Sequence, residues 1–229
     1  SNAGDVNGDG FDDVIVGASG ADLNGYASGS SYVVFGKTSG FDAAMNLSDL
    51  DGSNGFRLDG AAAGDNSGWA VSNAGDVNGD GFDDVIIGAP ARYGSAASYV
   101  VFGKANGFDA AIDLSGLDGN NGFRLDGEAA GDRSGFSVSN AGDVNSDGFD
   151  DVIIGFPRVD VVGNVDAGTS YVLFGSASKF KPEIDLSRLD SSTGLRLDGV
   201  AQFEYSGWRV NHAGDINGDG FGDVIIGAN

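Results

Sequence analysis

Cysteine is absent from the 229-residue chain, which excludes disulfide bonds, zinc–thiolate sites and thiol nucleophiles. Proline occurs only 3 times, which excludes a collagen-like repeat and a proline-rich linker. The chain has no run of about 18 apolar residues, so we expect no membrane insertion. These absences leave a folded domain, because 41% of the residues are hydrophobic and 10% are aromatic.

Basic residues are scarce as well. The chain has 12 Lys and Arg against 34 Asp and Glu, a formal net charge of −22. Nucleic acids and anionic membrane surfaces bind clustered Lys and Arg, so we expect neither as a partner. A folded domain this acidic repels itself unless cations neutralise it. From charge alone, bound cations and a merely soluble acidic surface are both open interpretations.

Histidine occurs once, as His212. A Ser-His-Asp triad would have to use this residue, and no serine is marked as its partner. His212 occupies the position that Asn73 and Asn140 hold in other copies of a repeat described below, which favours a structural role. We therefore expect no catalytic residues, no organic cofactor and no enzyme activity.

What the chain does contain is glycine, 41 residues of it, together with an internal repeat. A nine-residue loop rich in Asp, Asn and Gly occurs four times, at intervals of 71, 67 and 72 residues. We number these copies loop 1 (5–13), loop 2 (76–84), loop 3 (143–151) and loop 4 (215–223). They divide the chain into repeats at about 5–75, 76–142 and 143–214, with a partial repeat at 215–229. We expect residues 1–229 to be one repeat region of a larger protein.

Each repeat predicts four short strands, because short β-branched or aromatic runs alternate with Gly, Asn, Asp and Ser. The first three runs are 68–72 before loop 2, then 85–88 and 98–103 after it, and the fourth type is 55–59 with its counterparts in the later repeats. A short helical turn is possible at 46–50. The pattern predicts an all-β fold of β-propeller-type blades with four antiparallel strands each. About three repeats give a partial ring, or a ring completed by self-association through open blade edges.

The loop supplies the oxygen ligands that Ca²⁺ prefers. Positions 1, 3, 5 and 9 are Asp, Asn, Asp and Asp in all four copies, position 6 is Gly, and the carbonyl of Phe at position 7 is free to bind. We therefore predict three to four bound Ca²⁺ ions that also stabilise the fold. The predicted ligands are Asp5, Asn7, Asp9, Phe11 and Asp13; Asp76, Asn78, Asp80, Phe82 and Asp84; Asp143, Asn145, Asp147, Phe149 and Asp151; and Asp215, Asn217, Asp219, Phe221 and Asp223.

Three alternatives to a calcium site between two strands fit these residues less well. An EF-hand shares the start of the pattern but needs Glu at position 12, where this chain has Val16, Ile87, Ile154 and Ile226. Plain Asx turns would also use Asn, Asp and Gly, but they give no reason for the same oxygen side chains in every copy. Magnesium is disfavoured because its tight octahedral shell usually keeps several waters.

These residues resemble the FG-GAP repeat, the blade of the integrin α-subunit propeller. The best copy combines residues 67–71 with loop 2 and the following 85–90, Val-Ile-Ile-Gly-Ala-Pro. The resemblance implies a propeller with calcium between the first two strands of a blade, an extracellular or cell-surface location, and cell adhesion. The regular copies and the missing cysteines look like a bacterial member. Ser67-Gly68 replaces the family's Phe-Gly, and three repeats are fewer than an integrin ring uses.

The remaining repeated residues favour structure over binding. Trp69, Phe136 and Trp208 share one repeat position and are interpreted as blade packing; Arg57, Arg124 and Arg196 share another and are interpreted as ion-pair partners. The copies differ most at 19–30, 91–97 and 158–169, where we expect an unknown protein or glycan ligand to bind. The alternative functions are an accessory propeller of a secreted hydrolase or phospholipase, and a carboxylate-only hydrolase.

Overall fold

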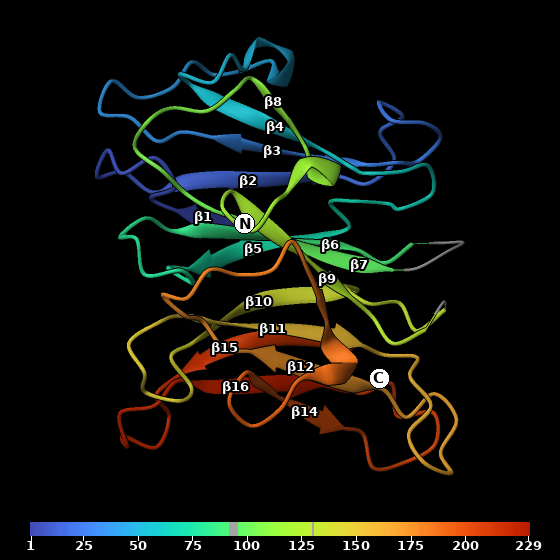
Figure 1. Cartoon of the computed structure of the whole chain (residues 1–229). Helices are drawn as coiled ribbons and strands as arrows, with labels where there is room; N and C mark the ends of the chain where they lie inside the picture. The colour runs from blue at the N-terminus through green and yellow to red at the C-terminus, as the bar shows by residue number, and fades with distance from the viewer. Residues whose placement is uncertain (92–95, 130) are drawn as a thin grey trace.

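The computed structural model describes residues 1–91, 96–129 and 131–229, which form β-sheets stacked one upon another (Figure 1). Blade 1 contains β1 (Asn2–Gly4), β2 (Asp13–Ala18), β3 (Ser30–Val34) and β4 (Gly55–Asp59). Blade 2 contains β5 (Ala70–Gly75), β6 (Asp84–Ala89), β7 (Ala97–Val101) and β9 (Gly122–Asp126). Blade 3 contains β10 (Ser137–Gly142), β11 (Asp151–Phe156), β12 (Thr169–Leu173) and β14 (Gly194–Asp198). The half-blade contains β15 (Arg209–Gly214) and β16 (Asp223–Gly227).

The four strands of each full blade pair antiparallel in chain order, which confirms the predicted all-β, propeller-type architecture. The stacked blades do not close a ring within the described chain (Figure 1). The only helices in the described ranges are the 3₁₀ turns η1 (Leu47–Asp49), η2 (Leu114–Gly116) and η3 (Leu186–Arg188). The first of these confirms the turn expected at 46–50. No helix among the described residues is long and apolar enough to cross a membrane.

The core lies between neighbouring blades. Successive side chains of a strand point to opposite faces, so Val85 and Ile87 of β6 pack toward blade 1 while Ile86 packs toward blade 3. All six residues of β6 are buried, because the strand is covered on both faces. This explains why its sequence is an uninterrupted apolar run instead of an alternating one. In blade 1 the equivalent β2 has a similar apolar run but alternates in burial, with Val14 48% exposed and Ile15 fully buried.

Two blades carry a fifth strand that the sequence did not predict. The short strand β8 (Ala111–Asp113) comes from the second repeat but pairs parallel with β4 at the outer edge of blade 1. In the same way β13 (Glu183–Asp185), from the third repeat, pairs parallel with β9 of blade 2. Each repeat therefore reaches back over the blade before it. Within the described residues β14 has no such fifth strand, and self-association through open edges remains a prediction.

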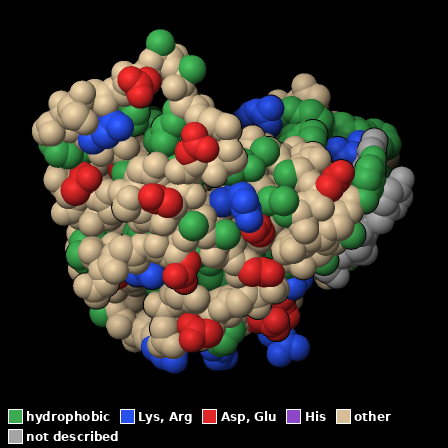
Figure 2. Space-filling model, turned by 90° about the horizontal axis from the view of Figure 1, so that it is seen from above, with side chains coloured by type: hydrophobic (Ala, Val, Ile, Leu, Met, Phe, Trp, Pro, Cys, Tyr) green, Lys and Arg blue, Asp and Glu red, His purple; other side chains and the backbone are tan. Residues whose placement is uncertain are grey.

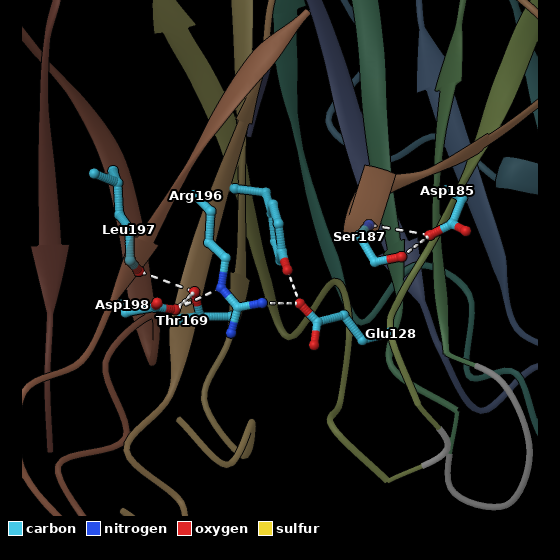
Figure 3. A network of polar contacts seen from close by, with 8 residues as sticks. Glu128, Thr169, Asp185, Ser187, Arg196, Leu197 and Asp198 are labelled. Atoms are coloured by element: carbon cyan, nitrogen blue, oxygen red, sulfur yellow. Dashed lines mark hydrogen bonds and ion pairs between the residues drawn. The ribbon is translucent and has the colours of Figure 1, made fainter. Parts of the chain in front are cut away.

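The repeated arginines form ion pairs, as the repeat pattern suggested. Arg57 pairs with Asp59 and Arg124 pairs with Asp126, each at 2.7 Å, and Arg196 pairs with Asp198 at 2.6 Å. Figure 3 shows that Arg196 also contacts Glu128, which follows β9 of blade 2. Three of these pairs thus lie within single strands, β4, β9 and β14, and the Arg196–Glu128 pair links blade 3 to blade 2. The repeated arginines do not form a row of free cations. Figure 2, the view onto blade 1, likewise shows acidic and basic side chains interspersed on that face.

Candidate metal-binding loops

The four loops lie at one edge of the stack, each between the first and second strand of its blade (left in Figure 1). Strand 1 ends at the residue before position 1, and strand 2 starts at position 9. In loop 2 the turn uses Gly79 and Gly81 at φ +72° and +90°, a region in which glycine is unstrained. Glycine at position 6 of every loop, and at position 4 of loops 1, 2 and 4, therefore lets the chain fold into a compact turn that brings the polar side chains together.

Positions 1, 3 and 5 come together in this turn. In loop 2 the Asp76 carboxylate accepts hydrogen bonds from the Asp80 and Gly81 N–H groups at 3.0 and 2.9 Å. The Asn78 side chain accepts from the Asp80 N–H at 2.8 Å and donates to the Asp80 carboxylate at 3.0 Å. Loops 1 and 3 repeat these bonds, and loop 4 repeats all except the last, the donation from the position 3 amide. The turn places two carboxylates and one amide oxygen next to each other.

Position 9 is held apart from the other three, below the turn. The Asp84 side chain is fully buried, and its two oxygens accept from the Val77 N–H at 3.0 Å and the Gly103 N–H at 2.9 Å. Burial raises the pKa of Asp84 well above its ordinary value, and it raises the pKa of Asp13 to about 6 and of Asp151 to about 7. The nearby carboxylates at positions 1 and 5 push in the same direction. A negative charge at Asp13, Asp84 or Asp151 is therefore disfavoured until a cation compensates it.

The residues present fit calcium in their chemistry. Every donor is a hard oxygen, and a carboxylate oxygen that accepts one N–H keeps a second lone pair for a metal. The side chains are not drawn together around a centre: no group of three or more His, Cys, Asp or Glu side chains in the described ranges is close enough to hold a metal. Calcium binding at the predicted ligands stays a prediction.

Position 8, which the motif analysis left out, connects one loop to the next. The Asp83 carboxylate accepts from the Asp5 N–H at 2.8 Å, and the Asp150 carboxylate accepts from the Asp76 N–H at 2.9 Å. Sequence offered one signal, because position 8 is Asp in three copies and Gly222 in the fourth. Position 8 is not one of the predicted ligand positions, so the ligand pattern alone gives it no role.

Comparison with known proteins agrees with this architecture. The FG-GAP repeat family matches residues 2–34, 67–101 and 134–173, and each match covers strands 1 to 3 of one blade with its loop. The chain is an FG-GAP repeat protein. It is 32% identical over 173 residues to phosphatidylinositol-glycan-specific phospholipase D of Bos taurus, an alignment that covers 70% of this chain.

Two integrin subunits are similarly close to this FG-GAP chain. Integrin alpha-4 of Xenopus laevis is 31% identical over 181 residues, or 76% of this chain. Integrin alpha-PS5 of Drosophila melanogaster is 32% identical over 159 residues, or 67% of this chain. The aligned part is 18% of the phospholipase and 15% and 14% of the two integrins, so the chain spans less than a fifth of each relative.

Proposed function

We propose that this chain is a calcium-stabilised, extracellular interaction module that binds a protein or glycan and has no catalytic activity of its own. The observation that carries the proposal is the buried position 9 carboxylate beneath a turn that already contains two more carboxylates. Such a group is unstable as a free anion, and a divalent cation bound at the turn would neutralise it. The integrin relatives support the extracellular location and the adhesive role.

Calcium should then stabilise the fold measurably. At a tenfold excess over its Kd, one bound ion adds about 1.4 kcal/mol of unfolding free energy. For a chain of this size that raises Tm by about 3–6 °C per site. We expect the chelated protein to melt cooperatively but lower, and millimolar Ca²⁺ to restore Tm. Calorimetric titration should count three to four sites.

A charge-matched pair of variants assigns the effect to the loops. D80N/D147N removes position 5 charges from loops 2 and 3 but keeps an oxygen for the Phe82 and Phe149 N–H groups. D42N/D109N removes two exposed charges outside the loops. The first variant should lose two sites in the titration, and the second should lose none. Equal calcium responses in both variants would reject the loops as the sites.

A second candidate function follows from the phospholipase relative. The chain would then be an accessory propeller whose catalytic part lies elsewhere in a longer protein. Both candidates share the calcium loops and differ in the partner: a separate protein or glycan in the first, and the catalytic part of the same longer protein in the second. We expect no hydrolysis of a phosphodiester or glycoside substrate by the chain alone, with or without Ca²⁺. Turnover that survives purification and is lost on substitution of a carboxylate outside the loops would instead support a hydrolase.

A further inference from the structure

A pocket lies at the edge of the blades opposite the calcium loops, where strand 1 begins and strand 2 ends. Its volume is about 440 Å³, and its lining includes Trp69, Arg133, Phe136 and Arg158. Pockets for small ligands usually measure about 300–1,000 Å³. Arg158 belongs to the variable segment 158–169, where a partner was expected; residues 92–95 of the segment 91–97 are outside the described residues.

An indole ring forms one wall of this pocket in a fixed orientation. Trp69 is 52% exposed, and its ring packs on Phe136 with centroids 5.7 Å apart. Phe136 is only 6% exposed, because it also contacts Trp208 at 4.7 Å. Blade packing, the role expected for this row of aromatics, therefore describes Phe136 but leaves one side of Trp69 free. An exposed, rigid aromatic wall offers apolar contact at little entropic cost.

The pocket is positively charged in a chain of net charge −22. Among the described residues, two arginines line it and no Asp or Glu does. Arg158 is exposed and forms no ion pair with any described residue. The guanidinium of Arg133 lies 5.9 Å from the centre of the Phe136 ring, which holds it beside the indole wall. A ligand in this pocket would therefore contact the two guanidinium groups and, beside them, the apolar surface of Trp69.

Both arginines depart from the repeat. Where Arg133 stands, the other copies have Asn66 and Tyr205, and where Arg158 stands they have Gly20 and Ala91. Arg133 also adopts φ +59°, a left-handed conformation that Asn tolerates better than Arg. The same turn forms without an arginine in the other copies, where Asn66 and Tyr205 adopt φ +55° and +52°. Arginines that break the repeat and meet in one pocket therefore point to binding.

We infer that this pocket binds a carboxylate-bearing sugar, such as a hexuronate unit of an acidic glycan. The C–H face of the pyranose ring would stack on Trp69, and the carboxylate would accept paired hydrogen bonds from the Arg158 guanidinium. A neutral sugar would stack on the indole but would offer no carboxylate to the Arg158 guanidinium. The inference rests on the proposed function, because it names the ligand of the same interaction module.

The test uses the whole chain in millimolar Ca²⁺ and follows tryptophan fluorescence and titration heat. The probes are a glucuronate-containing tetrasaccharide and a neutral glucose tetrasaccharide of the same length. We expect the acidic sugar to bind and the neutral one to bind at least about ten-fold more weakly, as loss of one charge-assisted hydrogen bond implies. Binding of the acidic sugar should weaken as salt is raised.

Variants separate the pocket from the rest of the surface. W69A should abolish binding, and R158A should weaken it about ten-fold. R188A is the matched control, because Arg188 is an exposed arginine that pairs with Asp185 away from the pocket. Equal binding of both sugars, or unchanged binding by W69A and R158A, would overturn the inference. So would binding of an oligoglutamate peptide in place of the acidic sugar.

The calcium-dependent melt of the same samples keeps the two proposals apart. A normal rise of Tm with Ca²⁺ but no sugar binding would overturn the pocket assignment alone. Sugar binding without any calcium response would overturn the calcium sites and leave the pocket standing. Each variant must also show the wild-type Tm rise, which verifies that W69A and R158A are folded when they fail to bind.

Discussion

A side chain attaches loops 2 and 3 to the loop before them, whereas loop 4 keeps only a backbone hydrogen bond, from the Gly222 N–H to the Asp143 carbonyl oxygen at 2.8 Å. Asp83 and Asp150 at position 8 accept the N–H of Asp5 and of Asp76 in the preceding loop. The equivalent residue of loop 4 is Gly222, which has no side chain to accept the Asp143 N–H. The predicted ligand pattern thus occurs four times, but the position 8 side chain attaches one loop to the next only twice in the described structure.

A second contact distinguishes the same junctions. At Gly8 and Gly79 an added Cβ would overlap the rings of Phe82 and Phe149, so each Phe packs directly on a glycine of the preceding loop. Loop 3 has Ser146 at that position, and Phe221 of loop 4 remains 41% exposed. The serine side chain occupies the space that the ring would need.

His212 also belongs to this third junction. Its ring lies over Gly142, where the earlier junctions place Asn and Asp side chains over Gly4 and Gly75. The Nδ1 atom lies 2.9 Å from the Ala141 carbonyl oxygen, so the ring contacts a carbonyl and not the N–H of position 1. This contact agrees with the structural role expected for His212. Loops with the same predicted ligand residues therefore differ in how many side-chain contacts hold them to the preceding loop.

The largest expected difference concerns position 9. D84A would leave the buried Val77 and Gly103 N–H groups without an acceptor, which should lower the free energy of unfolding by about 2–5 kcal/mol. Asp223 is only partly buried and accepts one hydrogen bond, from the Ile216 N–H. D223A should therefore cost less than about 1 kcal/mol. Urea unfolding of both variants in chelator checks this, and equal losses would contradict the comparison.

Removing the attachment itself should have the next largest effect. D150A leaves the partly buried Asp76 N–H unpaired, at an expected cost of about 1–3 kcal/mol. D12A is its control, because Asp12 occupies the same position in loop 1 but is exposed. That control should stay within about 0.5 kcal/mol of the parent chain. Thermal melts of the two variants suffice, and a D12A loss as large as that of D150A would show that position 8 matters within its own loop.

Much of this organisation could be predicted from sequence, because the repeat fixes the phase of strands and loops. The strand β6 is predicted by its apolar run, and the turn at 46–50 by its local sequence. The parallel strand β8 does not: residues 44–46 are its counterpart in repeat 1, yet they form no strand there. Its formation depends on a neighbouring blade edge, which no local pattern reveals. The separation of Asp84 from positions 1, 3 and 5 was not predicted either. It arises because Asp84 is the first residue of β6, where its side chain is buried.

A smaller gain is expected from restoring glycine in loop 3. Ser146 adopts φ +60°, a conformation that costs about 1 kcal/mol for a residue with a side chain. S146G should remove this strain and let Phe221 pack, against a loss of about 0.5 kcal/mol in backbone entropy. The net stabilisation should be about 0.5 kcal/mol or slightly more. The reverse change G79S should destabilise, because its Cβ would overlap the Phe149 ring. Opposite signs in chemical denaturation support the comparison, and equal signs refute it.

The smallest effect should come from rebuilding the third junction. H212N/G222D recreates the residues of the first two junctions and offers the Asp143 N–H a carboxylate. A Cβ at position 222 would lie 2.9 Å from the Ala141 carbonyl oxygen, so the backbone must shift by a few tenths of an ångström. That shift offsets much of a hydrogen bond worth about 1 kcal/mol, and we expect a net gain below about 0.5 kcal/mol. G222D alone should be neutral or destabilising, because the His212 ring still covers Gly142. Hydrogen exchange of the Asp143 amide is the sensitive measurement: slower exchange in the double variant only would show that position 8 holds one loop to the next.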